Sequence, residues 1–200
     1  ANMIEAAGAD RVLTMDLHAA QIQGFFDIPV DHLYAAPVLI RHLREHYVKD
    51  LNNLVVVSPD VGGVKMARAY SDALGAELAI VAKHRFNATH VEAMNVIGEV
   101  EGRDVVLIDD MTETAGTLCA AANILKERGA QRVFACVSHG VLGDMARDRI
   151  SGSSIERVLT SDTVPMAHGP KVDCVSVGDL LGHAVQRIHD GESVSSLFDI

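Results

Sequence analysis

The sequence predicts an α/β fold in which a mostly parallel sheet is flanked by helices, and three observations support this class. Short β-branched runs alternate with stretches of helical spacing along the chain, which is typical of parallel strands joined by helical crossovers. Some runs are apolar without interruption, as expected of central strands that are buried on both faces. Gly75, Gly129 and Gly191 each follow the last periodic residue of a helical stretch, where a left-handed helix end favours glycine.

The individual elements follow from these patterns. Seven segments have the composition of strands: 11–17, 54–58, 78–82, 104–109, 132–138, 157–162 and 172–177. Four have helical spacing, namely 37–50, 64–75, 116–129 and 178–191, and Pro37 suits a first helical turn. The stretch 85–102 is long and weakly periodic, so we expect a mobile loop that leads to an edge strand or hairpin.

Composition excludes some classes of protein. With 17 basic and 27 acidic side chains the net charge is −10, which argues against a general binder of nucleic acid or anionic membranes, although not against a local phosphate pocket. No apolar run approaches the roughly 18 residues of a membrane span, and no signal peptide is visible. Cys119, Cys136 and Cys174 lie in apolar runs, so we expect reduced, buried thiols in a cytoplasmic protein. The first residues already have a helical pattern, from which we expect the chain to begin inside a domain.

The stretch "VVLIDDMTETAGTL" (105–118) contains the strongest functional signal. An apolar strand runs directly into Asp109 and Asp110, and a small, hydroxyl-rich loop at 112–117 precedes the next helix. Ligands of open α/β sheets bind beyond the carboxyl ends of the strands, where this loop is expected to lie. Its small residues let backbone N–H groups approach an anion, and the helix N-terminus adds positive potential. The loop therefore predicts a phosphate site.

Two carboxylates beside that loop would repel a phosphate unless the ligand also carries hydroxyl groups. A sugar phosphate satisfies both conditions, with its phosphate on the backbone amides and its diol on Asp109 and Asp110. In the alternative interpretation, Thr114 caps the helix and the two acids are solvated charges at a strand end. The loop alone leaves both interpretations open.

The same loop resembles the phosphoribosyl-diphosphate loop of type I phosphoribosyltransferase folds. The segment "MDLHAAQIQGFFDIPVDHLYAAPVL" (15–39) is very close to the metal and ATP signature of the ribose-phosphate diphosphokinase family. Further stretches that match this family in order are "VVSPDVGGVKMARAYSDAL" (56–74), "KHR" (83–85), "VEAMNVIGEVEGRDVVLIDD" (91–110) and "ESVSSLFD" (192–199). The chain is identified as a member of that family by a likeness that runs from end to end.

The resemblance implies an activity, a cofactor and partners. Members of the family transfer the diphosphoryl group of Mg-ATP to the C1 hydroxyl of ribose 5-phosphate, which gives 5-phosphoribosyl 1-diphosphate and AMP. The implied cofactor is Mg²⁺ and the implied ligands are ATP and ribose 5-phosphate, with no nucleic-acid or membrane partner. A homo-oligomer is also implied, either a dimer or a hexamer built from dimers.

Roles for single residues also follow from the resemblance. The implied metal residues are His18 and Asp60, and Lys83 and Arg85 are the implied catalytic pair of a flexible loop. Three positions depart from the usual pattern: Glu113 replaces aspartate, Thr112 replaces an aliphatic residue, and His84 stands where many bacterial relatives have arginine. The ribose 5-phosphate residues implied are Asp109, Asp110, Glu113, Thr114, Ala115, Gly116 and Thr117.

A regulatory site for phosphate or ADP is implied at five further positions, which are Gln23, Asp31, Ser193, Ser195 and Phe198. The segment that holds the last three could equally form a terminal strand that packs Val194 and Leu197 inward.

The family is built from two related α/β domains, and this chain resembles the later two-thirds. Residues 1–35 would then be the remnant of a first phosphoribosyltransferase-like domain, 36–192 the second such domain with the ribose 5-phosphate loop, and 193–200 a tail that returns to the first domain. The remnant would expose apolar surface at "FFDIPV" (25–30) and in the first strand (11–17), through which we expect association as a dimer or larger assembly. Two alternatives stay open: a non-catalytic regulatory partner on the same fold, and a salvage phosphoribosyltransferase that shares only the 108–117 loop.

Overall fold

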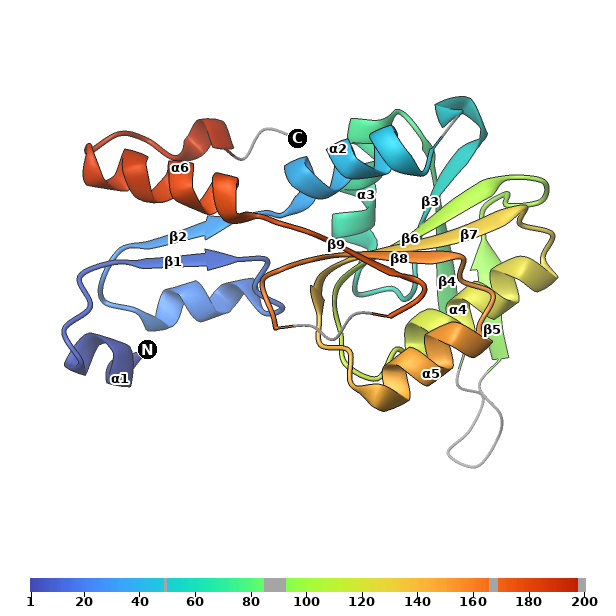
Figure 1. Ribbon diagram of the computed structural model, residues 1–200, viewed down its shortest axis with the longest axis horizontal. Coiled ribbons are helices and arrows are strands. Elements are labelled where there is room, and N and C mark those ends of the chain that lie inside the picture. Colours follow the sequence, from blue (N-terminus) through green and yellow to red (C-terminus); the bar gives the residue numbers. More distant parts are fainter. Residues whose placement is uncertain (49, 85–92, 166–168, 198–200) are drawn as a thin grey trace.

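The structure, a computed structural model, describes every residue of the chain except 49, 85–92, 166–168 and 198–200 (Figure 1). The side chains of residues 83, 84, 93 and 94 also lie outside the described part. The described elements form a seven-stranded sheet with helices on both faces and a separate two-stranded sheet (Figure 1).

All but one of the strands in the larger sheet are parallel. Its spatial order is β5 (Ala93–Ile97), β4 (Glu77–His84), β3 (Leu54–Ser58), β6 (Asp104–Thr112), β7 (Arg132–Gly140), β8 (Arg157–Ser161) and β9 (Val172–Val175). Strand β5 alone runs antiparallel, against β4. The mostly parallel α/β fold is therefore confirmed, as is an edge strand within 85–102.

Two apolar clusters hold helices against opposite faces of this sheet. Strand β3 contributes to both, because Val55 and Val57 point into one cluster while Leu54 and Val56 point into the other. The first cluster includes residues of α4 (Gly116–Glu127) and α5 (Asp144–Gly152), and the second includes residues of α2 (Ala36–His46) and α3 (Val64–Leu74). Burial on both faces explains why β3 is apolar along most of its length.

The smaller sheet is formed by β1 (Val12–Met15) and β2 (Val30–Leu33), which are parallel. Helix α1 (Asn2–Ala6) precedes it, and the 3₁₀ helix η1 (Ala20–Phe25) connects its strands, while η2 (Leu51–Asn53) precedes β3. Helix α6 (Gly178–His189) and the 3₁₀ helix η3 (Ser195–Leu197) return to this sheet, and α6 lies beside β2 (Figure 1). Ala184 of α6 and Val194 share a buried cluster with Met15 and Leu33.

Several details differ from the sequence prediction. Strand β6 continues to Thr112, beyond the expected end at 109, because it stays paired with β7 as far as Gly140. The tail forms a 3₁₀ turn rather than a strand, although Val194 is buried as expected. Cys119 and Cys136 are buried free thiols, but Cys174 is exposed because it lies on the edge strand β9.

The helix ends agree with the prediction. Gly75, Gly129 and Gly191 have positive φ angles of 64°, 88° and 72°, which a residue with a Cβ adopts only with strain. Every helix among the described residues falls short of the length and apolar character needed to cross a bilayer.

Candidate functional site

Two predicted site residues that are far apart in sequence meet at one end of the larger sheet. His18 follows β1, and its Nδ1 lies 2.7 Å from Oδ2 of Asp110 on β6, across 92 positions of sequence. Asp110 raises the pKa of the His18 imidazole through this hydrogen bond and through its charge. The His18 side chain is 74% exposed, so the imidazole remains open to a ligand. The structure thus joins the predicted metal residue to the predicted sugar-binding acid.

Asp109 is the buried member of the acidic pair. Burial, followed by the neighbouring charge of Asp110 and to a smaller extent that of Asp60, raises the pKa of its carboxyl to about 7. The Asp110 N–H donates to Asp109 Oδ1 at 3.0 Å, which partly offsets these effects. A carboxyl that is hard to ionise beside two other acids marks a place where a bound cation would be favourable.

Asp60 lies in the loop between β3 and α3 and accepts two hydrogen bonds from residues of the same region. Its Oδ1 accepts a hydrogen bond from the Gly63 N–H at 3.0 Å, and its carbonyl oxygen accepts one from Ser58 Oγ at 2.7 Å. A Cβ on Gly63 would lie 2.9 Å from Ser58 Oγ, so glycine is required here for space. The Asp60 charge acts on both His18 and Asp109, which places all three around one acidic cluster.

The residues of this cluster fit a magnesium ion that keeps other ligands. Carboxylate oxygens are the donors that Mg²⁺ prefers, and a protein commonly supplies only one or two of them while water and substrate phosphates supply the rest. Within the described part of the chain, no group of three histidine, cysteine, aspartate or glutamate side chains is close enough to enclose a metal by itself. His18 and Asp60 could therefore hold the ion only together with water or phosphate oxygens.

The predicted phosphate loop leads into α4 with an unusual backbone. Ala115 is the N-cap residue, it is buried, and its φ of 54° is left-handed. Among the described residues no side chain caps this helix end, so the alternative in which Thr114 serves as the cap is wrong. The first N–H groups of a helix have no partner inside the helix. This end of α4 therefore keeps the donors that an anion would need.

A cation that sequence reasoning missed lies beside this loop. Arg149 of α5 donates from Nη1 to the carbonyl oxygen of Thr114 at 3.0 Å. The same guanidinium would lie 3.5 Å from a Cβ on Gly116, which places its charge at the start of α4. The sequence of α5 gave no sign of this proximity, because only the packing of α5 against α4 creates it.

The remaining predicted site residues differ in how exposed they are and in whether the structure describes their side chains. Glu113 and Thr114 are exposed, Gly116 and Thr117 are half-buried, and the unusual Thr112 is buried at the end of β6. Lys83 lies within β4, but its side chain is outside the described part, and Arg85 lies outside the described residues altogether.

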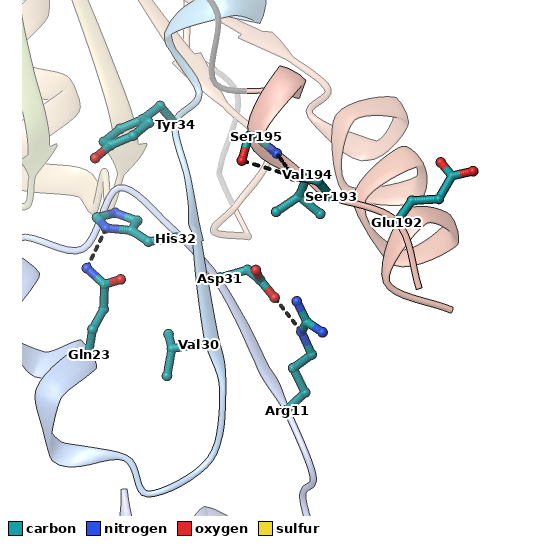
Figure 2. A pocket seen from close by; sticks show the side chains of 10 residues that line it. All are labelled: Arg11, Gln23, Val30, Asp31, His32, Tyr34, Glu192, Ser193, Val194 and Ser195. Atoms are coloured by element: carbon teal, nitrogen blue, oxygen red, sulfur yellow. Dashed lines mark hydrogen bonds and ion pairs between the residues drawn. The ribbon is translucent and has the colours of Figure 1, made fainter. Parts of the chain in front are cut away.

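Four of the five predicted regulatory residues line one pocket of about 400 Å³ (Figure 2). Arg11 Nε lies 2.5 Å from Asp31 Oδ2, and Gln23 Nε2 lies 3.0 Å from His32 Nδ1. Figure 2 shows these pairs on one side of the pocket and the 193–195 segment on the other. Sequence reasoning missed Arg11 and His32, while the predicted Phe198 lies outside the described residues. The predicted residues that the pocket brings together are Gln23, Asp31, Ser193 and Ser195.

Comparison with known proteins gives one family and a consistent set of relatives. The family model described as "Phosphoribosyl synthetase-associated domain" matches residues 85–199. The chain is 51% identical to a ribose-phosphate pyrophosphokinase of Chlorobaculum tepidum, covering 100% of this chain and 62% of that protein. It is 53% identical to a protein of the same name from Ralstonia nicotianae, covering 99% and 63% respectively. The chain thus spans less than two-thirds of the length of these relatives.

Solved structures agree with the fold. A crystal structure of phosphoribosylpyrophosphate synthetase from Mycobacterium smegmatis matches with a TM-score of 0.87 and 37% identity, covering 96% of this chain and 62% of that one. A crystal structure of adenine phosphoribosyltransferase matches with a TM-score of 0.50 and 17% identity, covering 62% and 76%. The second likeness supports the type I phosphoribosyltransferase fold alone.

Proposed function

The chain belongs to the phosphoribosyl synthetase-associated domain family, and from this premise we propose that it carries the sugar-phosphate and metal part of a ribose-phosphate diphosphokinase. The proposed reaction transfers the diphosphoryl group of Mg-ATP to the C1 hydroxyl of ribose 5-phosphate, giving 5-phosphoribosyl 1-diphosphate and AMP. The observation that carries the proposal is the 2.7 Å contact between His18 Nδ1 and Asp110 Oδ2, because the family resemblance implies a metal role for the first residue and a sugar-binding role for the second.

We assign the sugar phosphate to the end of β6 and the start of α4. The carboxylates of Asp109 and Asp110 would accept hydrogen bonds from the ribose hydroxyls. The uncapped amides at the start of α4 would donate to the 5-phosphate, and the guanidinium of Arg149 would add positive charge nearby. Fixed alignment of the sugar in this way lowers the entropic part of the barrier to transfer.

His18 and Asp60 are the residues that we propose to hold Mg²⁺, for the reasons of charge and donor type given above. The bound ion would neutralise the phosphates of ATP and favour charge movement toward the leaving group. Lys83 and Arg85 are proposed to bring further positive charge to the transferring group, as the family resemblance implies.

Three further assignments stay proposals. The pocket at Gln23, Asp31, Ser193 and Ser195, with Phe198, is proposed to bind a regulatory phosphate or ADP. Segments 1–35, 36–192 and 193–200 are proposed as the remnant domain, the second domain and the returning tail. A cytoplasmic location and a homo-oligomeric state, as a dimer or a hexamer built from dimers, complete the proposal.

The decisive experiment adds ribose 5-phosphate to the chain and then ATP with Mg²⁺, following sugar binding by calorimetry and AMP by chromatography. We expect ribose 5-phosphate to bind, and AMP formation to show whether this length of chain also turns over. Lys83→Ala should keep the sugar bound while abolishing any turnover. Lys126→Ala, which removes an exposed bond from the far end of α4 to the Gln131 carbonyl, is the matched control and should change neither reading.

The outcomes separate the competing functions. Binding of the sugar phosphate without AMP would indicate a part of the enzyme that needs further residues for turnover. A folded chain that binds neither ligand would contradict the proposal and favour a non-catalytic regulatory partner. Equal turnover by Lys83→Ala and the unchanged chain would contradict the role given to Lys83.

A further inference from the structure

The turn that presents His18 has a strained backbone. It begins at Asp16, directly after β1, and Asp16 has a φ of 40°, in the left-handed region that residues with a Cβ seldom adopt. Asp16 is also nearly inaccessible, with 3% of its surface exposed. A strained residue persists only where surrounding contacts determine its conformation, so the contacts of Asp16 decide where His18 lies.

The Asp16 carboxylate is held from two directions. Its Oδ2 accepts a hydrogen bond from the Ala35 N–H, at the start of α2, at 3.0 Å. The same oxygen accepts a second one from Ser138 Oγ, on β7, at 2.6 Å. Its Oδ1 has no hydrogen-bond partner among the described residues. The side chain of Asp16 therefore connects the small sheet to β7 of the larger one.

His139, the next residue of β7, holds the backbone of the same turn. Its Nε2 lies 3.1 Å from the carbonyl oxygens of both Met15 and Asp16. Carbonyl oxygens only accept, so this nitrogen must carry the hydrogen. On the other side of the ring, Nδ1 lies 2.7 Å from Oγ1 of Thr163. Contacts on both ring nitrogens thus fix the orientation of the ring.

The position of His139 connects it to the other half of the site. In the pairing of β6 with β7, His139 lies opposite Met111, the residue after Asp110. The contact of His18 with Asp110 is solvent-exposed, and exposed ion pairs contribute too little to order a turn by themselves. The order of the turn must therefore come from other contacts, which are those of Asp16 and His139 and the hydrogen bond that the Leu17 N–H donates to His32 Nε2 at 3.0 Å.

We propose that His139 is a positioning residue, which fixes the turn at residues 15–18 through two backbone carbonyls and so holds His18 beside Asp110. This inference rests on the proposed function for its consequence, because His18 is there a metal residue. His139 itself touches neither metal nor substrate in this assignment.

The test uses the full chain and two measurements. The first is hydrogen exchange at the amides of Leu17 and His18, which reports the order of the turn without any ligand. The second is the dissociation constant of Mn²⁺, used as a paramagnetic probe in place of Mg²⁺. In His139→Ala we expect exchange at these amides to accelerate and the Mn²⁺ dissociation constant to rise by about tenfold, the low end for loss of a group that orients a metal ligand.

Two variants make the result specific. His139→Gln keeps a side-chain N–H donor and should restore both readings toward those of the unchanged chain. Tyr47→Phe removes the phenol hydroxyl that donates to Asp173 at the far edge of the sheet, so it tests a general loss of stability and should leave both readings unchanged.

The outcomes distinguish this inference from the proposed function. Unaltered exchange and Mn²⁺ affinity in His139→Ala would overturn the positioning role, as would an equal effect of Tyr47→Phe. If the unchanged chain bound no Mn²⁺, the proposed function would fail. The exchange measurement would then still decide whether His139 orders the turn.

Discussion

The Asp109 carboxyl should make the stability of the metal-free chain depend on pH. Its pKa of about 7 in the folded chain compares with 3.8 in an unfolded one. Between these values the folded state binds more protons than the unfolded state, so this group makes the free energy of unfolding fall as pH rises from about 4 to about 7. Above that range the folded chain must keep a partly buried negative charge beside Asp110.

Asp109→Asn should therefore stabilise the metal-free chain at pH 8 and leave it nearly unchanged at pH 4. The pKa difference sets an upper limit of about 4 kcal/mol, and residual contact of the carboxyl with water reduces the expected gain to about 2 kcal/mol. Urea unfolding at the two pH values measures it, with Asp148→Asn on the exposed face of α5 as the control. Equal stability of Asp109→Asn and the unchanged chain at pH 8 would refute this account.

The predicted site residues came from two sources: Asp109, Asp110 and the loop after them have a local signature, whereas His18, Asp60, Lys83 and Arg85 were implied by the family resemblance. Asp109 and Asp110 interrupt an apolar run, and that interruption is visible without a structure. Asp16, His139 and Arg149 are different, because their contacts join β1, β7 and α5 to segments distant in the chain. No spacing in the sequence encodes such contacts, and only the packed sheet creates them.

Replacing either of two glycines by alanine should change the free energy of unfolding, but in opposite directions. One glycine lies in the loop after β3 and the other in helix α6. Gly63→Ala would place a methyl group 2.9 Å from Ser58 Oγ, so the loop must shift and the free energy of unfolding should fall by about 1–2 kcal/mol. Gly182 lies inside the exposed part of α6 with no atom within 4 Å of an added Cβ. Gly182→Ala should therefore raise stability by about 0.5–1 kcal/mol through helix propensity alone.

These changes in stability can be measured by thermal unfolding of both variants and of the unchanged chain. Because Gly63 donates to Asp60, we also expect Gly63→Ala to weaken Mn²⁺ binding, while Gly182→Ala should leave it unchanged. Stabilisation by Gly63→Ala would show that the loop is looser than its contacts indicate.

The strands and helices that the sequence predicted well are those whose burial is uniform. Strand β3 is buried along its whole length, and its predicted range was correct. The sequence failed for β2, where Asp31 and His32 line a pocket and conceal the alternation of a strand. The sequence also failed to predict α5. Only Ala146 and Ile150 of this helix are buried, and two apolar positions are too few to show the periodic pattern of a helix.

The candidate site takes residues from both sheets of the chain, so its geometry depends on how the two sheets are placed. His18 comes from the end of the smaller sheet and Asp110 from the larger one. The buried cluster that contains Met15, Leu33, Ala184 and Val194 binds the smaller sheet to α6 and the tail. Figure 1 shows α6 on the side of the molecule where β1 and β2 lie. Packing of the tail and geometry of the site are therefore physically linked.

The predicted self-association belongs to the smaller sheet and the elements around it. Phe25 at the end of η1 is 66% exposed, and Met3, Ile4 and Ile22 of the same region are also exposed. Exposed apolar residues that gather on neighbouring elements commonly mark a protein interface. We therefore expect the chain to associate at micromolar concentration, and Phe25→Glu to shift it toward monomer because a buried, unpaired carboxylate opposes the contact.

Sedimentation velocity over a hundredfold concentration range would measure this, with Ile97→Glu as the matched control. Ile97 is comparably exposed but lies on β5, at the opposite edge of the larger sheet, so its charge should not alter association. A single monomeric species of the unchanged chain at all concentrations would contradict the prediction. An equal response of both glutamate variants would instead assign the association to general hydrophobicity rather than to the Phe25 surface.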